Sequence, residues 1–164
     1  MKARLARWIV GQKPRRTLVR ALVLAAVCFV VFRHAFRPVW VDGDSMAPTV
    51  RSGTFRFANL LAFVRHEPRT GDIVVIEMAG RRVMYLKRIL AVPGERFAFT
   101  NGVLYVDGRV RPEPYVVFRG RWTTGVHALG PDQYYVAGDN RDGPIEGHAT
   151  GIVERWRIAG GLMF

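Results

Sequence analysis

The sequence predicts an all-β fold, mainly antiparallel, preceded by one N-terminal transmembrane α-helix. Residues 21–32 form an uninterrupted apolar run, which is typical of a membrane helix. From Val39 onward, β-branched and aromatic residues come in short runs between Gly, Pro, Asp and Asn, as in strands joined by turns. A length of 164 residues, with 49% hydrophobic and 23% charged residues, suits one folded domain and excludes a disordered or low-complexity chain.

Basic residues dominate the beginning of the chain. Seven Lys or Arg side chains lie among residues 1–20, and no acidic residue precedes Asp42. As a helix, the apolar run reaches only about 18 Å, whereas a membrane span needs roughly twenty residues. Residues 17–36 must therefore form the span, with Arg20 and Arg33 extending to the two interfaces.

The same segment could also be a cleaved signal peptide or the buried helix of a soluble protein. A cleaved signal peptide should end in small residues at alternating positions, but the apolar run is followed by the charged or bulky residues Arg33, His34, Phe36 and Arg37. An uncleaved signal anchor is therefore favoured, and a buried core helix is the least favoured alternative. By the positive-inside rule, we expect a basic cytoplasmic arm at residues 1–16, a transmembrane signal anchor at 17–37 and an exported β domain at 38–164.

The net charge of +12 would also suit binding to a polyanion such as nucleic acid. We expect a lipid bilayer as the partner and no nucleic acid, because the basic arm directly adjoins the apolar span. The single cysteine, Cys28, cannot form an internal disulfide or a Cys-based metal site. We therefore expect no metal and no other cofactor.

Short strands are expected throughout the exported region. Asn101-Gly102 and Asp107-Gly108 each separate two apolar runs, and these residue pairs favour tight hairpin turns because they tolerate positive φ. The expected strands are Val39–Val41, Thr54–Phe57, Asp72–Glu77, Arg82–Val92, Arg96–Thr100, Val103–Val106, Arg109–Arg111, Gln133–Ala137 and one near Ile158.

Three segments of this region carry reactive side chains. Ser45 lies in the turn 43–49, where a serine is more often structural than nucleophilic, since its hydroxyl needs a base. Lys87 is the one lysine of the exported region and lies in an expected strand. If buried, it would lose its charge and could act as a base; on its own, the segment favours an edge-strand lysine that reaches solvent. Residues 138–144 on their own favour an Asx-rich turn with an internal Asp–Arg pair.

Together these segments resemble type I signal peptidases, the serine–lysine membrane proteases that remove signal peptides from exported proteins. The resemblance covers nearly the whole chain, and four short motifs in the family's order are highly specific. The motifs are Ser-Met-Ala-Pro-Thr at 45–49, Gly-Asp-Ile-Val at 71–74, Lys-Arg-Ile-Leu-Ala-Val-Pro-Gly-Glu at 87–95 and Gly-Asp-Asn-Arg-Asp at 138–142.

The resemblance implies that Ser45 is the acylating nucleophile and Lys87 its general base, within a catalytic domain at residues 38–164. It also implies a variable insertion at about residues 96–132. The backbone N–H of Ser45 would form part of the oxyanion hole. The residues expected to support the oxyanion hole and the active site are Gly43, Met46, Asp139, Asn140, Arg141 and Asp142.

The family further implies signal-peptide-bearing preproteins as substrates, with small residues at positions −1 and −3. It implies a single-pass protein of the bacterial inner membrane, with the N-terminus in the cytoplasm and the catalytic domain on the outer face. Two alternatives remain: a specialised peptidase that matures a pilin or another conjugative-transfer protein, and an inactive, membrane-tethered family member.

Four positions depart from the family pattern. Gly43 stands where the family often has a hydroxyl that serves as the second oxyanion donor. Pro144 replaces a serine that lies near the lysine amine, so Lys87 must be oriented by other groups. Glu146 and His148 occupy the positions of an Asp–Arg pair, and we expect them to pair in its place.

Overall fold

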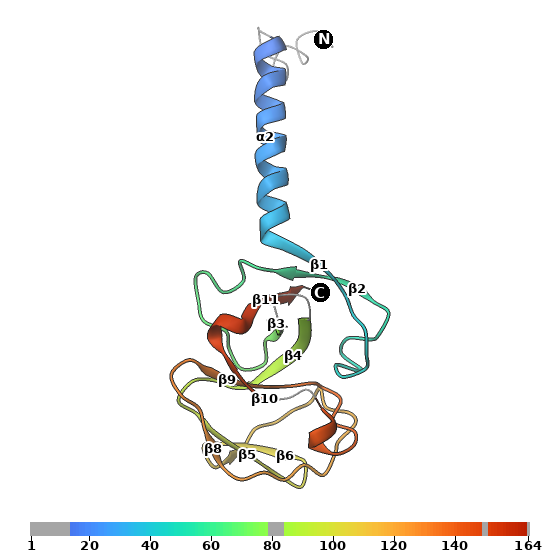
Figure 1. Ribbon diagram of the computed structural model, residues 1–164, viewed down its shortest axis with the longest axis vertical. Coiled ribbons are helices and arrows are strands. Elements are labelled where there is room, and N and C mark those ends of the chain that lie inside the picture. Colours follow the sequence, from blue (N-terminus) through green and yellow to red (C-terminus); the bar gives the residue numbers. More distant parts are fainter. Residues whose placement is uncertain (1–13, 79–83, 149–150, 164) are drawn as a thin grey trace, which may run out of the picture. The chain divides into compact units, whose positions relative to one another are not determined.

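The computed structural model describes residues 14–78, 84–148 and 151–163, and the chain divides into two compact units after Phe36. The first unit contains the helix α2, Pro14–Ala35 (Figure 1). An apolar stretch within this helix, with a mean hydropathy of 2.0, makes it long and apolar enough to cross a membrane. The predicted N-terminal helix is confirmed, although it ends one residue before the expected Phe36. Residues 1–13 of the predicted basic arm lie outside the described residues.

The second unit, Arg37–Phe164, is built from two β-sheets. Two short 3₁₀-helices, η2 at Ile145–Gly147 and η3 at Arg155–Arg157, lie near its C-terminal end. Its strands are β1 (Phe36–Trp40), β2 (Phe55–Asn59), β3 (Ile73–Glu77), β4 (Met84–Ala91), β5 (Arg96–Thr100), β6 (Val103–Val106), β7 (Arg109–Val110), β8 (His127–Ala128), β9 (Gln133–Ala137), β10 (Gly151–Glu154) and β11 (Ile158–Met163).

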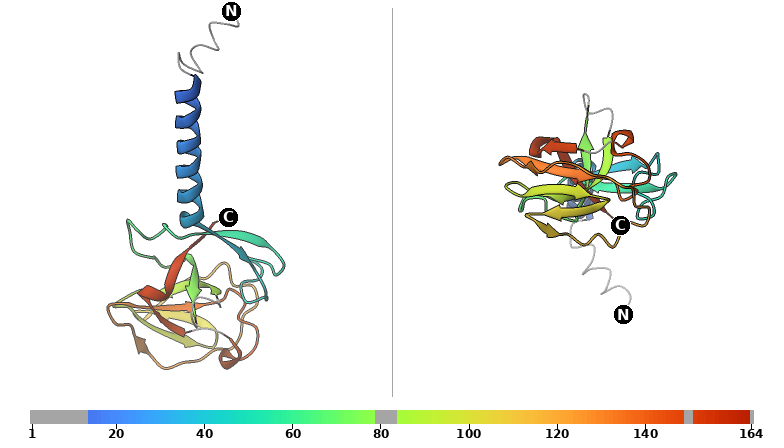
Figure 2. Two further views of the ribbon diagram at one scale, coloured as in Figure 1. Left: turned by 45° about the horizontal axis from the view of Figure 1, so that its top comes forward. Right: turned by 90° about the horizontal axis from the view of Figure 1, so that it is seen from below.

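The larger sheet has seven strands in the order β1-β2-β11-β3-β4-β9-β10, and the smaller has four in the order β7-β6-β5-β8. Within this unit the smaller sheet is grouped apart from β1, β2 and β11, as Figures 1 and 2 show. Strand β4 pairs antiparallel with β3 on one side and with β9 on the other. Lys87 therefore lies on an interior strand, and the edge-strand alternative is wrong.

Apolar side chains fill the space on both faces of the central strands. In β3, Ile73 and Val75 belong to one buried cluster while Val74 and Ile76 belong to another, so this strand has no solvent-facing side until Glu77. This explains its continuous apolar run, since a strand covered on one face only would alternate. A third cluster joins the two sheets through Leu90, Ala91, Phe97, Phe99, Leu104, Val106, Trp122, Leu129, Tyr135 and Ala137.

Both predicted hairpin turns are confirmed. Asn101 and Gly102 have φ values of 47° and 78°, and Asp107 and Gly108 have values of 49° and 75°. Two consecutive residues with positive φ give the turn the twist that joins adjacent antiparallel strands. These turns connect β5 to β6 and β6 to β7, which builds three strands of the smaller sheet.

Other strand predictions were less accurate. The first strand begins at Phe36 rather than Val39, and Pro38 is tolerated because β1 is an edge strand. Strands β8 and β10 were not predicted, because β8 has only two residues and β10 begins with a glycine, which weakens the strand signal. The predicted strand 82–92 is observed as Met84–Ala91, and residues 82 and 83 lie outside the described part of the chain.

Candidate active site

Ser45 and Lys87 lie in direct contact although they are far apart in the sequence. Ser45 belongs to a turn after β1, and Lys87 lies in the middle of β4, opposite Val74 of β3. The Lys87 Nζ is 2.9 Å from the Ser45 Oγ, which is within hydrogen-bond distance. Only 3% of Lys87 is exposed to solvent. The two residues that the family resemblance identified as nucleophile and base are thus brought together.

The environment of Lys87 favours its neutral form. Burial lowers the pKa of the Lys87 amine from 10.5 to about 8, although the nearby carboxylate of Asp139 opposes this shift by favouring the charged form. Among the described residues, Ser45 is the only hydrogen-bond partner of the amine. With a pKa of about 8, roughly a tenth of Lys87 is neutral at pH 7 and available to accept a proton.

The turn that carries Ser45 is fixed at both ends by backbone hydrogen bonds. The Ala47 N–H donates to the Asp44 carbonyl, and the Val50 N–H donates to the Met46 carbonyl. Met46, which is 1% exposed, packs into a core cluster and holds the turn against the larger sheet. Within the described part of the chain, the Ser45 N–H donates to no other atom, so it is free to bind a substrate oxygen.

Asn140 holds the same turn through two hydrogen bonds. Its backbone N–H donates to the Ser45 carbonyl at 3.0 Å, and its side-chain Nδ2 donates to the Asp44 carbonyl at 3.2 Å. Gly138 allows this close approach, because a Cβ atom at this position would lie only 2.1 Å from the Ser45 carbonyl oxygen. The segment after β9 thus sets the position of the turn that carries Ser45.

Asp139 is fully buried and links the four sequence motifs. Arg88 donates from Nε to Oδ1 at 2.8 Å and from Nη2 to Oδ2 at 2.6 Å, a two-point contact that compensates for the burial of both charges. Thr49 donates its hydroxyl to the same carboxylate, and the third guanidinium nitrogen of Arg88 donates to the Gly71 carbonyl at 2.7 Å. Arg88 was not among the site residues predicted from the sequence. Its position next to Lys87, with its side chain on the opposite face of β4, could have indicated that it belongs to the site.

Arg141 does not form the internal Asp–Arg pair that the turn suggested. It pairs with Glu113, a residue of the long connection between β7 and β8, at 2.7 Å. Both side chains are buried, with 2% of Arg141 and 5% of Glu113 exposed. The pairing could not be predicted from the motif, because Glu113 lies outside every segment that resembled the family.

The end of the last motif is held mainly by backbone groups. Asp142 is exposed, and its N–H donates to the Asn140 Oδ1, which confirms the predicted Asx turn. His148 is hydrogen-bonded to the Asp142 carbonyl and packs edge-on against Trp122. Residues 84–148 contain no ion pair between Glu146 and His148, so that expectation is wrong: the η2 turn separates the two side chains and directs His148 elsewhere.

Gly43 has a local conformational reason to be glycine. Its φ is 97°, in the region that disfavours residues with a side chain, although a Cβ atom would meet nothing within 4 Å. Its N–H donates to the Ser52 Oγ at 3.1 Å. A serine or threonine at position 43 would be strained in this backbone.

Across the described ranges, no group of three or more His, Cys, Asp or Glu side chains could hold a metal ion.

Comparison with known proteins identifies the family. Residues 15–164 match the model of the family described as signal peptidase, peptidase S26. The chain is 26% identical over 182 aligned residues to signal peptidase IB of Staphylococcus aureus strain Mu50, which covers 100% of this chain and 90% of that protein. It is 30% identical over 158 residues to signal peptidase I of Bacillus licheniformis, which covers 89% of this chain and 85% of that protein.

A solved structure of a signal peptidase I from Enterococcus faecalis V583 also matches, with 20% identity and a TM-score of 0.48. This match covers 59% of the present chain and 97% of the other. The family match over residues 15–164 and the two relatives carry the assignment. The chain belongs to the signal peptidase family, peptidase S26, and is a membrane-anchored serine endopeptidase.

Proposed function

We propose that this protein removes N-terminal signal peptides from exported preproteins, with Ser45 as the nucleophile and Lys87 as the general base. One observation carries the proposal: the buried Lys87 amine lies 2.9 Å from the Ser45 hydroxyl. Membership of the signal peptidase family supports the same substrate class. The catalytic domain acts on the outer face of the bacterial inner membrane, with the N-terminus of the chain in the cytoplasm.

In the acylation step, neutral Lys87 accepts the hydroxyl proton of Ser45 while the Ser45 oxygen attacks the carbonyl carbon of the scissile bond. The tetrahedral intermediate carries its negative charge on the former carbonyl oxygen, which accepts a hydrogen bond from the Ser45 N–H. Protonated Lys87 then donates its proton to the leaving amine. The C–N bond breaks, the mature protein departs and the signal peptide remains as an ester on Ser45.

In the deacylation step, Lys87 is neutral again and accepts a proton from a water molecule that attacks the ester carbonyl. The ester C–O bond breaks, Ser45 recovers its proton from Lys87, and the signal peptide leaves with a free carboxylate. Arginine could not replace Lys87 in either step, because its guanidinium stays charged. The low pKa of Lys87 is therefore the property on which both steps depend.

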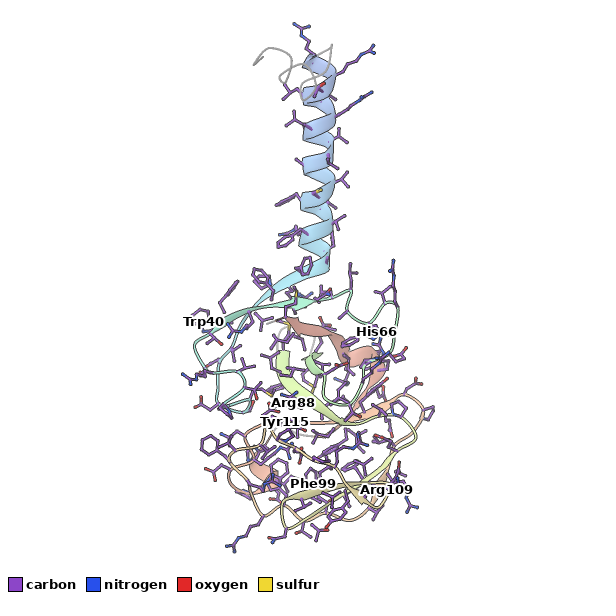
Figure 3. The ribbon with its side chains drawn as sticks, turned by 180° about the vertical axis from the view of Figure 1, so that it is seen from behind. Trp40, His66, Arg88, Phe99, Arg109 and Tyr115 are labelled. Atoms are coloured by element: carbon purple, nitrogen blue, oxygen red, sulfur yellow. The ribbon has the colours of Figure 1, made fainter. Side chains whose placement is uncertain are left out.

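The surface formed by β1, β2 and the turn after β2 suits contact with lipid headgroups. Large apolar side chains are exposed there, with Trp40 at 67%, Phe55 at 48% and Leu61 at 53%. Figure 3 labels Trp40, which points away from the sheet. Leu60, by contrast, packs against a core cluster, so it serves the fold and not this surface.

The proposal is tested with the full-length protein in detergent and a preprotein that carries an Ala-x-Ala cleavage site. We expect cleavage after the second Ala, and we expect Ser45→Ala and Lys87→Ala each to abolish it. Thr54→Val is the control, because it removes a hydroxyl that donates to the Arg51 carbonyl and leaves the dyad and the hydrogen bond of Gly43 in place.

Each other outcome has a definite meaning. Cleavage of a pilin-type precursor without cleavage of the general preprotein would indicate a specialised peptidase. A folded wild-type protein that cleaves neither substrate would indicate an inactive family member. Activity that survives in either dyad variant would refute the proposed mechanism.

A further inference from the structure

We propose that Glu113 and Tyr115 are positioning residues of the active site. Through them, the connection between β7 and β8 holds in place residues 43–49, the turn that carries Ser45 and is called the nucleophile turn below. This inference rests on the proposed function, because it assigns these residues to the Ser45–Lys87 site. Neither side chain touches Ser45 or Lys87. Both act through the two buried arginines that adjoin the catalytic motifs.

The first contact runs from Glu113 to Arg141. The Arg141 Nη2 donates to the Glu113 Oε1 at 2.7 Å, and Nη1 lies 3.5 Å from Oε2. The guanidinium also stands over the rings of Trp122 and Phe99, with centroid distances of 5.2 and 5.6 Å. Glu113 therefore fixes the direction of an arginine that would otherwise be an unpaired buried charge.

The second contact runs from Tyr115 to Arg88. The Tyr115 hydroxyl donates to the Glu113 Oε1 at 3.0 Å, while its ring lies 4.0 Å from the Arg88 Cζ. Figure 3 shows Arg88 and Tyr115 side by side, with Phe99 further along in the smaller sheet. Tyr115 thus connects the Glu113–Arg141 pair to the Arg88–Asp139 pair, and four buried or half-buried charges form one network.

The network reaches the nucleophile through Asn140. The Arg141 Nε donates to the Gly138 carbonyl at 2.5 Å, which closes the turn that contains Asn140. The Arg141 N–H donates to the Phe118 carbonyl, so the backbone of this turn is also attached to the β7–β8 connection. Asn140 in turn holds the Ser45 carbonyl. A shift of Arg141 must therefore move Asn140 and, with it, the backbone of the nucleophile turn.

This arrangement predicts a loss in catalytic rate that stability alone does not explain. Misplacing reacting groups by about 1 Å can reduce a rate roughly 100-fold. Substrate binding should change little, because neither Glu113 nor Tyr115 touches the dyad. A residue with a purely structural role would instead lower the amount of folded enzyme and leave the kcat of the folded fraction unchanged.

The experiment compares four variants of the full-length protein in detergent. Glu113→Gln keeps the size of the side chain and the acceptor for Tyr115 but removes the charge. Tyr115→Phe removes only the hydroxyl and keeps the ring on Arg88. The double variant Glu113→Leu with Arg141→Met removes both buried charges, so no unpaired charge remains. Arg111→Gln is the control, because Arg111 lies in the same connection and the substitution breaks its more exposed pair with Glu95, which precedes β5.

We expect Glu113→Gln to lower kcat roughly 10- to 100-fold with KM changed less than about 2-fold, and Tyr115→Phe to show a smaller loss of the same kind. The double variant should recover the melting temperature of the wild type but not its kcat. Arg111→Gln should retain both. A double variant that recovers kcat together with stability, or a Glu113→Gln variant with unchanged kcat, would overturn the inference.

A second measurement does not depend on activity. Hydrogen exchange of the segment 138–142 reports the Asn140 N–H, which is bonded to the Ser45 carbonyl. We expect faster exchange of this segment in Glu113→Gln and in the double variant, but not in Arg111→Gln. Unchanged exchange in all variants would refute the positioning role even if the wild type cleaves preproteins. Faster exchange in Glu113→Gln, together with a wild type that cleaves no preprotein, would retain the link from Glu113 to the turn that carries Ser45 and reject the proposed function.

Discussion

Replacing Lys87 by methionine should make the protein more stable at neutral pH while abolishing its activity. The substitution keeps a long, unbranched side chain but removes an amine that is costly to bury in its charged form. A pKa lowered from 10.5 to about 8 corresponds to about 3 kcal/mol of unfavourable free energy for the folded state at low pH. Losing the hydrogen bond to Ser45 offsets about 1 kcal/mol of this gain. The net stabilisation at pH 7 should be about 2 kcal/mol.

The pH dependence distinguishes this cause from improved packing. The pKa of Lys87 is lower in the folded state than in the unfolded state, so the unfolded chain binds more protons between pH 8 and 10.5. The stability of the wild type must therefore rise with pH across this window. The advantage of Lys87→Met should be largest below pH 8 and should fall by about 2 kcal/mol on going to pH 9.5.

The assay is equilibrium unfolding of the full-length protein in detergent, followed by tryptophan fluorescence at pH 7 and pH 9.5. Ser45→Ala is the control, because it removes the hydrogen bond but leaves the buried amine and its pH dependence. A Lys87→Met variant that is no more stable than the wild type at pH 7 would refute the reasoning. An advantage that stays constant with pH would show that the gain comes from packing and not from the charge.

Three further predictions concern the same site. The kcat/KM for preprotein cleavage should rise with pH through a midpoint near 8 as Lys87 loses its proton, and a flat profile would contradict its role as the base. Lys87→Arg should be inactive at every pH. Gly138→Ala should cost at least about 2 kcal/mol in chemical unfolding and most of the activity, because its Cβ would lie 2.1 Å from the Ser45 oxygen; wild-type stability would exclude the clash. Arg88→Lys should cost about 3 kcal/mol in the same assay, because lysine cannot make the two-point contact with Asp139; a cost below about 1 kcal/mol would refute the role of that pair.

Local features of the fold could be predicted from the sequence because they depend on neighbouring residues. The apolar run of residues 21–32 indicated the helix, and Asn101-Gly102 indicated a hairpin turn through its tolerance of positive φ. The order of strands in the larger sheet was not predictable in this way, since β11 pairs with both β2 and β3 across long stretches of sequence. For the same reason the segment around Lys87 favoured the wrong, edge-strand interpretation.

The candidate site likewise combines features that the sequence predicts with features that depend on the tertiary structure. The proximity of Ser45 and Lys87 came from the family resemblance, because nothing in the two segments themselves brings residues 42 positions apart into contact. Glu113 was missed because its role depends on a single partner, Arg141. The two residues meet only when the tertiary structure has formed, since they are far apart in the sequence. Asp139 was selected, but its partner Arg88 was not, because an ion pair between a strand and a turn leaves no mark on the apolar periodicity of the sequence.

The buried carboxylate of Asp139 also has a consequence for how the sequence can change over evolutionary time. Thr49 and Arg88 both donate hydrogen bonds to this carboxylate. A substitution at one of the three positions therefore changes which residues are tolerated at the other two. Neutral substitutions at these positions should accordingly occur in pairs. Pro144 and Glu146 are exposed and lie beyond that point of convergence. Positions of this kind can vary one at a time, and two of the four departures from the family pattern lie here.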